Sequence, residues 1–330
     1  MTEEKISPLL TIAIPTYNRN DKVKRIVEIL LPQLKGYAQL VIFDNCSNIS
    51  VEYTVKDYLL KDNIRVVRND LNIGMSGNFI KCFEYCNTEW LWVLGDDDYP
   101  YANAVETVIN NLFKWPDASF LNFNSFMAPG RSQDIAFLGA KELVRGLDSF
   151  GNLLCISLGL YNANKLCSGL RFAYQYAYTV APQIAYLLTG LKDGQALLLN
   201  DELINFAAHD TDPGELWSWV SLSSVIGSLA ELPLNLDEEA YKIFSGHLLT
   251  HIQRPEQLYG ILLSNSYYTP KEKLRYFKLI YDRSTFGRLI CERTPSFIKY
   301  YIKLWIYSLR NRQANKISDD YSHYKRIERI

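Results

Sequence analysis

Short apolar runs alternate with stretches of helical period over about the first 125 residues of the chain. The apolar runs have the length of strands and lie at residues 9–14, 40–43, 64–67 and 90–94. The stretches of helical character between them lie at residues 20–34, 50–61 and 75–87. Strands that are apolar on both faces and alternate with helices predict an α/β fold with a mostly parallel sheet flanked by helices.

The alternation weakens after residue 125, and a second pattern begins near residue 215. The next predicted elements are a loop, a strand and a helix that begins or is interrupted at Pro182, over residues 127–139, 154–161 and 178–191. Beyond residue 215 the apolar spacing is mainly helical. We therefore expect two domains, an α/β domain over residues 1–212 and a helical C-terminal region over residues 213–330.

Polar residues follow each of the first four predicted strands. In parallel sheets, ligands bind beyond the carboxyl ends of the strands. The residues at those ends are Thr16-Tyr17-Asn18-Arg19, Asp44-Asn45, Arg68-Asn69-Asp70 and Asp96-Asp97-Asp98. The sequence therefore predicts a ligand site at this edge of the sheet.

The acidic run Asp96-Asp97-Asp98 is the strongest candidate for chemistry. Two carboxylates ~5 Å apart at an effective dielectric of ~20 repel each other by about 3 kcal/mol, so three in succession need a compensating group. A hard divalent cation, Mn²⁺ or Mg²⁺, accepts carboxylate oxygens and completes its shell with phosphates and water. Strict D-x-D spacing favours Asp96 and Asp98 as ligands, with Asp97 as the alternative. The competing interpretation is a solvated acidic turn that caps a helix starting near Tyr101.

Two further polar segments suit a nucleotide. Asp44 closes the second predicted strand, where its carboxylate can accept from a base N–H or a ribose hydroxyl, or can merely form an Asx-turn. Residues 69–78 contain two glycines and three asparagines before an amphipathic stretch, and their backbone N–H groups can cradle a phosphate. Neither the G-x-x-x-x-G-K-[ST] loop nor the G-x-G-x-x-G motif occurs in the chain.

Four segments carry a family resemblance over roughly residues 8–115. They are LTIAIPTYNR at residues 10–19, VIFDNCS at 41–47, Asn72-Ile73-Gly74 with Asn78, and LGDDD at 94–98. In order and spacing they resemble family 2 glycosyltransferases, whose fold is GT-A, a Rossmann-like and mostly parallel sheet flanked by helices. Within that family the chain is similar to bacterial O-antigen and other surface-polysaccharide transferases of the abequosyltransferase-like kind.

The resemblance implies a site for a nucleotide-sugar donor. It implies that Asp44 contacts the base and that the run Asp96, Asp97 and Asp98 holds the ribose and the metal on the diphosphate. The other donor-binding residues that it implies are Pro15, Thr16, Tyr17, Arg19, Asn45, Asn72, Gly74 and Asn78. The reaction it suggests is a metal-assisted, inverting hexosyl or deoxyhexosyl transfer, in which a carboxylate base takes the proton of the acceptor hydroxyl.

The base is where the chain departs from the family pattern. Members usually carry an acidic pair at the head of a helix some 80–95 residues beyond the metal motif, whereas this chain has the sequence YTVAPQ at residues 178–183. Asp193, just past that helix, and Asp148 are the candidates, with Asp201 and Asp210 as further options.

Charge is distributed unevenly along the chain. Residues 271–330 carry 15 Lys/Arg against 6 Asp/Glu, although the whole chain has a formal net charge of −1. Within that tail the aromatic and basic stretch 297–312 suits either a membrane interface or a docked helix. A polyprenyl-diphosphate-linked saccharide acceptor would give such a membrane contact a purpose, and no motif indicates nucleic-acid binding.

No segment at the N-terminus has the apolar length of a signal peptide, and no stretch approaches the ~20 apolar residues of a membrane span. We expect a cytoplasmic protein, at the cytosolic face of the inner membrane if the tail binds lipid. The cysteines show no spacing typical of a disulfide framework or a zinc site. Two other functions stay open, a nucleotidyltransferase and a non-catalytic subunit that binds nucleotide or saccharide in a polysaccharide assembly.

Overall fold

The computed structural model describes residues 8–60, 63–208 and 226–248. The chain divides into two compact units, one comprising residues 1–215 with 232–235 and the other comprising 216–231 with 236–330. In the second unit the described residues form a 3₁₀ helix, Gly227–Glu231, and helix α11, Glu238–Leu248. All other described elements belong to the first unit.

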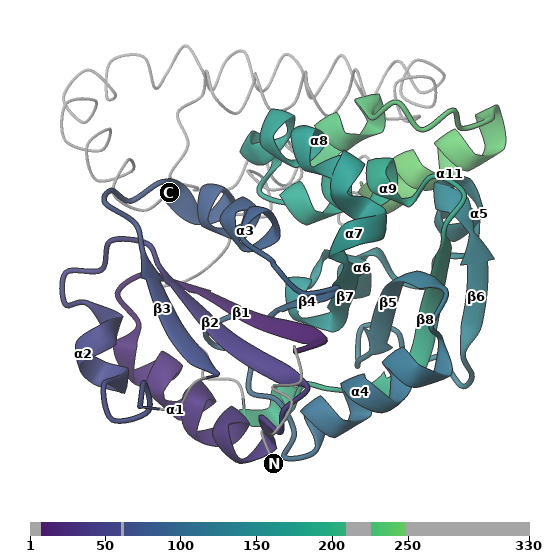
Figure 1. Ribbon diagram of the computed structural model, residues 1–330. Coiled ribbons are helices and arrows are strands. Elements are labelled where there is room, and N and C mark those ends of the chain that lie inside the picture. The colour runs from purple at the N-terminus through teal and green to yellow at the C-terminus, as the bar shows by residue number, and fades with distance from the viewer. Residues whose placement is uncertain (1–7, 61–62, 209–225, 249–330) are drawn as a thin grey trace, which may run out of the picture. The chain divides into compact units, whose positions relative to one another are not determined.

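A mixed sheet forms the centre of the first unit. Over the described residues it has eight strands in the order β3-β2-β1-β4-β7-β5-β8-β6 (Figure 1). The strands are β1 (Leu10–Thr16), β2 (Ala38–Asp44), β3 (Ile64–Arg68), β4 (Trp90–Val93), β5 (Ala118–Asn124), β6 (Ile135–Leu138), β7 (Gly159–Asn162) and β8 (Gln195–Glu202).

Strand direction decides which chain ends share an edge of this sheet. Strands β1 to β4 are parallel, and β5 pairs in parallel with β8. Strand β7 is antiparallel to both of its neighbours, β4 and β5, so β5 and β8 run in the same direction as the first four strands. The carboxyl ends of these six strands therefore lie along one edge, together with the amino ends of β7 and β6.

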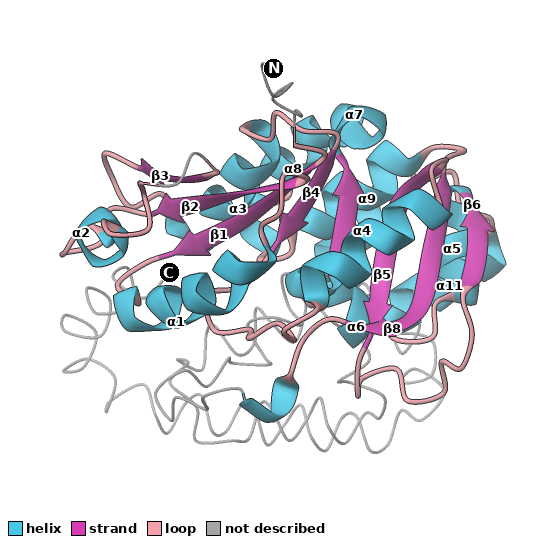
Figure 2. Ribbon diagram, turned by 60° about the horizontal axis from the view of Figure 1, so that its bottom comes forward, coloured by secondary structure: helices cyan, strands magenta, loops and turns pink. Residues whose placement is uncertain are grey.

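Helices cover both faces of the sheet (Figures 1 and 2). The α-helices of the first unit are α1 (Asn20–Leu30), α2 (Val51–Val55), α3 (Gly74–Glu84), α4 (Ala104–Lys114), α5 (Gly139–Gly146), α6 (Phe150–Leu154), α7 (Ala163–Leu166), α8 (Leu170–Gln175) and α9 (Pro182–Leu191). Helices α1 and α4 lie on one face, and α3, α8 and α9 lie on the other.

The core follows from the two periodicities of the sequence. On β1, alternate side chains of Leu10, Ile12 and Ile14 are fully buried and belong to one hydrophobic cluster with α1 and α4. On the other face the rings of Phe83 and Tyr186 lie 4.4 Å apart between their centroids and join α3 to α9. Because side chains on both faces of the strands are buried, the positions of the strand ends and of the polar residues that follow them are fixed.

The four predicted strands and the flanking helices are confirmed, with differences in the second half of the unit. The sheet contains more antiparallel pairing than predicted, because β7 and β6 are both reversed. The predicted strand at 154–161 is only Gly159–Asn162, preceded by a 3₁₀ helix, Ile156–Leu158. The predicted loop at 127–139 contains β6, and strands β5 and β8 had no counterpart among the predicted strands.

Candidate functional site

The acidic run leaves the sheet at the carboxyl end of β4. Thr16 is the last residue of the adjacent strand β1, and Arg19 lies in the turn that follows it. The Thr16 hydroxyl donates to Asp96 Oδ2 at 2.7 Å, and Arg19 Nη1 donates to Asp96 Oδ1 at 2.7 Å. The same nitrogen reaches Asp97 Oδ2 at 3.2 Å. Parallel pairing of β1 with β4 thus brings together four residues that the sequence predicted to share a site.

Asp96 is a buried carboxylate with a cationic neighbour. Burial raises the pKa of Asp96, while the charge of Arg19 and the hydrogen bond from Thr16 oppose that rise. Because Asp96 is only 6% exposed, removal of Arg19 would leave its negative charge in a poorly solvated position. Arg19 is therefore the principal counter-ion of Asp96.

Asp98 is held from a different part of the chain. The Ser157 hydroxyl donates to Asp98 Oδ2 at 2.5 Å and accepts from the Gly95 N–H at 2.8 Å. Gly95 leaves the space for this contact, because a Cβ there would stand 2.8 Å from Asp98 Oδ2. No local motif in the sequence marks Ser157, since its position depends on the antiparallel pairing of β7 with β4.

The carboxylate of Asp44 is fully buried and already engaged by the protein. Its oxygens accept from the backbone N–H groups of Ser47, at 2.8 Å, and Val51, at 3.2 Å, and from Arg68. A hydrogen bond from Asn18 N to Ser47 Oγ ties the turn after β1 to the turn after β2. Asp44 thus lies at the expected edge, and in this structure it organises the turn after β2.

Four asparagines form an amide network between β2, β3 and α3. Asn45 Nδ2 donates to Asn72 Oδ1 at 2.8 Å, and Asn45 Oδ1 accepts from Asn69 Nδ2 at 2.9 Å. Asn69 Nδ2 also reaches Asn78 Oδ1 at 3.1 Å, and Lys81 Nζ donates to Asn69 Oδ1 at 2.6 Å. The sequence predicted Asn45, Asn72 and Asn78 as donor contacts; in the structure Asn45 binds Asn72 directly and is linked to Asn78 through Asn69.

The remaining predicted donor residues border the same edge of the sheet. Gly74 has a φ of 76° and begins α3, and its carbonyl accepts from Asn45 Nδ2 at 3.3 Å. Pro15 is buried within β1 opposite Phe43, whereas Tyr17 is partly exposed in the turn that follows. Tyr17 and Gly74 are therefore accessible to a ligand at this edge in a way that Pro15 is not.

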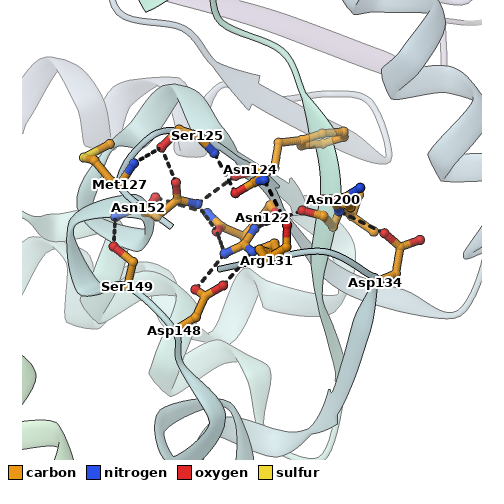
Figure 3. A network of polar contacts seen from close by, with 12 residues as sticks. Asn122, Asn124, Ser125, Met127, Arg131, Asp134, Asp148, Ser149, Asn152 and Asn200 are labelled. Atoms are coloured by element: carbon orange, nitrogen blue, oxygen red, sulfur yellow. Dashed lines mark hydrogen bonds and ion pairs between the residues drawn. The ribbon is translucent and has the colours of Figure 1, made fainter. Parts of the chain in front are cut away.

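Asp148, expected as a candidate base, is instead one half of an ion pair. Arg131 Nε donates to Asp148 Oδ2 at 2.7 Å and Nη2 donates to Oδ1 at 2.8 Å, and the Arg131 side chain is fully buried (Figure 3). Arg131 also donates to the side chain of Asn122, which accepts from Asn152 Nδ2 as well. Both carboxylate oxygens of Asp148 serve this network, which joins β5 to the segment before β7.

Asp193, the other candidate base, lies at the edge of the sheet opposite to the acidic run. It is exposed in the turn between α9 and the amino end of β8, and β8 runs in the same direction as β4. Because Asp96 follows the carboxyl end of β4, the sheet separates the two aspartates. Asp201, near the carboxyl end of β8, accepts from Asn111 Nδ2 at 2.8 Å, and Asp210 lies outside the described residues.

Helix α9 has no acid at its head. Gln183 is its second residue, 2% exposed, and donates from Nε2 to the Leu154 carbonyl at 2.8 Å. Gln183 Oε1 is buried without a hydrogen-bond partner in the part of the chain that the structure describes. Val180, just before the helix, has a φ of 64°, a strained value for a β-branched residue. Strain and an unpaired buried acceptor thus occur together at the position where the resemblance led us to expect the base.

The acidic run fits a cation that is shared with a ligand better than one caged by protein. Among the described residues no three His, Cys, Asp or Glu side chains gather as a metal site. Magnesium-type sites on phosphates commonly use one or two carboxylates and complete their shell with phosphate and water. Both oxygens of Asp96 are engaged, by Thr16 and Arg19. Asp97 Oδ2 accepts from Arg19 and Asp98 Oδ2 accepts from Ser157, so each carboxylate of the run already has a partner within the protein.

Among residues 8–60, 63–208 and 226–248, no helix has the length and apolar character needed to cross a bilayer. The aromatic and basic stretch 297–312 lies outside the described residues.

Comparison with known proteins shows that the N-terminal part of the chain is similar to glycosyltransferases. Residues 11–132 match the model of the family described as glycosyl transferase family 2. A 94-residue stretch is 28% identical to the abequosyltransferase RfbV of Salmonella typhimurium, covering 27% of this chain and 28% of that protein. A 113-residue stretch is 27% identical to an uncharacterized glycosyltransferase of Haemophilus influenzae, covering 34% of this chain and 37% of that protein. The chain thus spans about a third of the length of these relatives.

The fold is also that of solved structures. Residues 1–349 of S. aureus TarS superpose with a TM-score of 0.61 at 15% identity, covering 92% of this chain and 91% of TarS. The same TarS segment in complex with UDP-GlcNAc gives a TM-score of 0.53 at 14% identity, covering 86% of this chain and 91% of that one. At this identity the likeness establishes the fold, which is GT-A.

Proposed function

We propose that this chain, whose residues 11–132 match the model of glycosyl transferase family 2, transfers a sugar from a nucleoside-diphosphate sugar to a saccharide acceptor. The observation that carries this proposal is the acidic run at the carboxyl end of β4, with Asp96 clamped by Thr16 and Arg19 from the next strand. That arrangement offers carboxylates for a cation and a guanidinium for a diphosphate within one short strand edge. Complexes of TarS with UDP and with UDP-GlcNAc support a donor of this class.

In this proposal Arg19, the acidic run and Asp44 have separate tasks. Arg19 is within reach of two carboxylates and can turn to an incoming diphosphate, for which a guanidinium fork is well suited. Asp97 and Asp98 would hold Mn²⁺ or Mg²⁺. When bound, such a cation neutralises the charge that develops on the departing nucleoside diphosphate. Asp44 shapes the turn against which the base would lie, because its carboxylate fixes the Ser47 and Val51 N–H groups.

A second candidate function is a non-catalytic subunit that binds nucleotide or saccharide. Gln183 favours it, since an amide at the head of α9 cannot act as a general base. Sugar transfer with inversion at the anomeric carbon belongs to the glycosyltransferase proposal only, and it requires a general base. Asp148 is paired with Arg131, and Asp193 lies at the opposite edge of the sheet, so we propose another residue as the base. Nucleotidyl transfer would need a glycine-rich basic loop after β1, and Pro15-Thr16-Tyr17-Asn18-Arg19 does not supply one.

For the acceptor we propose a saccharide on a polyprenyl diphosphate, used in bacterial surface-polysaccharide synthesis of the O-antigen type. The partial similarity to an abequosyltransferase and the basic stretch 297–312 support this choice. The enzyme would then act in the cytoplasm at the inner face of the membrane. Co-sedimentation of the full chain and of a chain ending near residue 294 with anionic vesicles tests the membrane part; equal binding by both would contradict it.

The experiment that tests the donor site is a thermal-shift panel. UDP, GDP, CDP and dTDP are added to the protein with and without Mn²⁺, because a ligand that binds the native state raises the melting temperature. At least one nucleotide should stabilise the wild type in a metal-dependent way, and Asp98→Asn should abolish the metal-dependent part. If no nucleotide stabilises the wild type in the presence of Mn²⁺, the proposed function fails. Radiolabelled sugar transfer with the binding nucleotide's sugars then separates the enzyme from the non-catalytic subunit.

A further inference from the structure

Ser157 makes three hydrogen bonds to the strand and turn that carry the acidic run. Its carbonyl accepts from Trp92 Nε1 at 2.7 Å, its hydroxyl accepts from the Gly95 N–H at 2.8 Å, and that hydroxyl donates to Asp98 Oδ2 at 2.5 Å. Ser157 and Trp92 are both fully buried. One residue from the second half of the unit therefore contacts β4, the glycine after it and the last acid of the run.

The topology of the sheet places Ser157 there. It lies in the 3₁₀ helix Ile156–Leu158, directly before β7, and β7 pairs antiparallel with β4, with Trp92 opposite Leu160. In an antiparallel pair the chain entering one strand lies beside the chain leaving the other. A second bond anchors the same turn from β5, because Asn122 Nδ2 donates to the Leu158 carbonyl at 3.4 Å.

The direction of the Ser157 hydroxyl is fixed by its neighbours. A serine hydroxyl has one proton to donate and two lone pairs with which to accept. The Gly95 N–H can only donate, so it takes a lone pair of Ser157 Oγ. The acceptor within 2.5 Å is Asp98 Oδ2, and the Ser157 proton therefore points at this oxygen. A hydrogen bond to a carboxylate is strong enough to set the rotation of the Asp98 side chain.

We propose that Ser157 is a positioning residue that orients Asp98 for a divalent cation, an inference that rests on the proposed function of the acidic run. A carboxylate that is already oriented loses less conformational freedom on binding a cation than one that rotates freely. Gly95 is needed for the same contact, because a Cβ at this position would stand 2.8 Å from Asp98 Oδ2 and 3.3 Å from Ser157 Oγ.

The test compares Ser157→Ala with a matched control, Ser119→Ala. Ser119 is also buried, on β5, but near the amino end of that strand and so at the opposite edge of the sheet. Binding of Mn²⁺ alone is followed by electron paramagnetic resonance, and binding of UDP, GDP, CDP and dTDP with Mn²⁺ by calorimetry. Ser157→Ala should weaken Mn²⁺ binding by roughly 10- to 100-fold, as replacement of a partner that orients a metal ligand typically does. Ser119→Ala should bind as the wild type does.

Asp98→Asn separates positioning from a general loss of structure. If Ser157 acts through Asp98, adding Ser157→Ala to Asp98→Asn should weaken Mn²⁺ binding by no more than about twofold further, since coupled residues are not additive. Should Ser157→Ala fail to fold, Ser157→Cys keeps the volume and a weak donor, and an intermediate affinity is expected. Melting curves of all variants check that they fold.

The outcomes for Ser157 and for the proposed function are distinct. Mn²⁺ binding by Ser157→Ala within about twofold of the wild type, or full additivity with Asp98→Asn, overturns the positioning role. A wild type that binds Mn²⁺ but none of the four nucleotides sinks the proposed function, and Ser157 is then judged by Mn²⁺ alone. A wild type that binds neither overturns both.

Discussion

Replacing Arg19 by methionine should destabilise the protein, and the loss should grow with pH. Methionine keeps an apolar stem and removes the guanidinium that lies 2.7 Å from Asp96 Oδ1 and 3.2 Å from Asp97 Oδ2. Breaking a buried ion pair by removing one partner typically costs 3–5 kcal/mol. Because the Arg19 side chain is 28% exposed and Thr16 still donates to Asp96, we expect a smaller loss of about 2 kcal/mol at neutral pH.

The pH dependence follows from the direction of the Asp96 shift. Burial raises the pKa of Asp96 above its ordinary value, and Arg19 is the largest opposing influence. Without Arg19 the pKa of Asp96 in the folded state rises further, while that in the unfolded state is unchanged. An acid whose pKa is raised by folding favours the native state when it is protonated and loses this contribution as pH rises through the folded-state pKa. The difference between wild type and variant should therefore be small in acid and full at neutral pH.

Urea unfolding in metal-free buffer at about pH 4.5 and about pH 7.5 measures this difference directly. Asp96→Asn in both backgrounds is the control, because a neutral amide cannot titrate, and the pH dependence of the Arg19→Met effect should then disappear. A difference of the same size at both pH values would refute the assignment of Arg19 as the counter-ion of Asp96. So would an Asp96→Asn background that keeps the full pH dependence.

Three other substitutions separate structural roles from roles in binding. Asp148→Ala should cost about 3 kcal/mol in urea unfolding, because it leaves the guanidinium of Arg131 buried and unpaired, yet nucleotide and Mn²⁺ binding should survive in the folded fraction. Gly95→Ala should weaken Mn²⁺ binding by about tenfold in a titration, since the new Cβ forces Asp98 to move, and wild-type affinity would contradict this. Asp193→Asn should transfer sugar at the wild-type rate in the radiolabel assay, because the sheet separates it from the acidic run, and a loss of about 100-fold would restore it as a base.

The meeting of polar residues after β1 and β4 could be predicted because it depends on local sequence patterns. Each motif follows a buried parallel strand, and parallel strands deliver their carboxyl ends to one edge whatever their order in the sheet. Thr16 and Arg19 therefore lie next to Asp96, although about 80 residues separate them from it in the sequence. The pattern of apolar runs was sufficient to predict that these residues lie close together, and the structure shows which of them donates to each oxygen of Asp96.

The second half could not be predicted in the same way because its contacts depend on reversed strands. Insertion of β7 between β4 and β5 brings Ser157 to Asp98, yet residues 154–161 contain only three strand residues, and nothing in their sequence shows that the strand is reversed. Asp148 had the right chemistry for a base, but a bidentate partner, Arg131, lies 17 residues earlier in a stretch predicted as loop. Composition could not tell a catalytic carboxylate from one that is neutralised by a buried arginine.

A chain of hydrogen bonds nevertheless links the second half of the sheet to the acidic run. Arg131 and Asn122 hold the carboxyl end of β5, Asn122 holds the turn at Leu158, and Ser157 in that turn holds Asp98. A change in the buried network of Figure 3 can therefore reach the acidic run through two hydrogen bonds without touching a ligand. Ser157, which no local motif marks, thus contacts Asp98, which the acidic motif does mark.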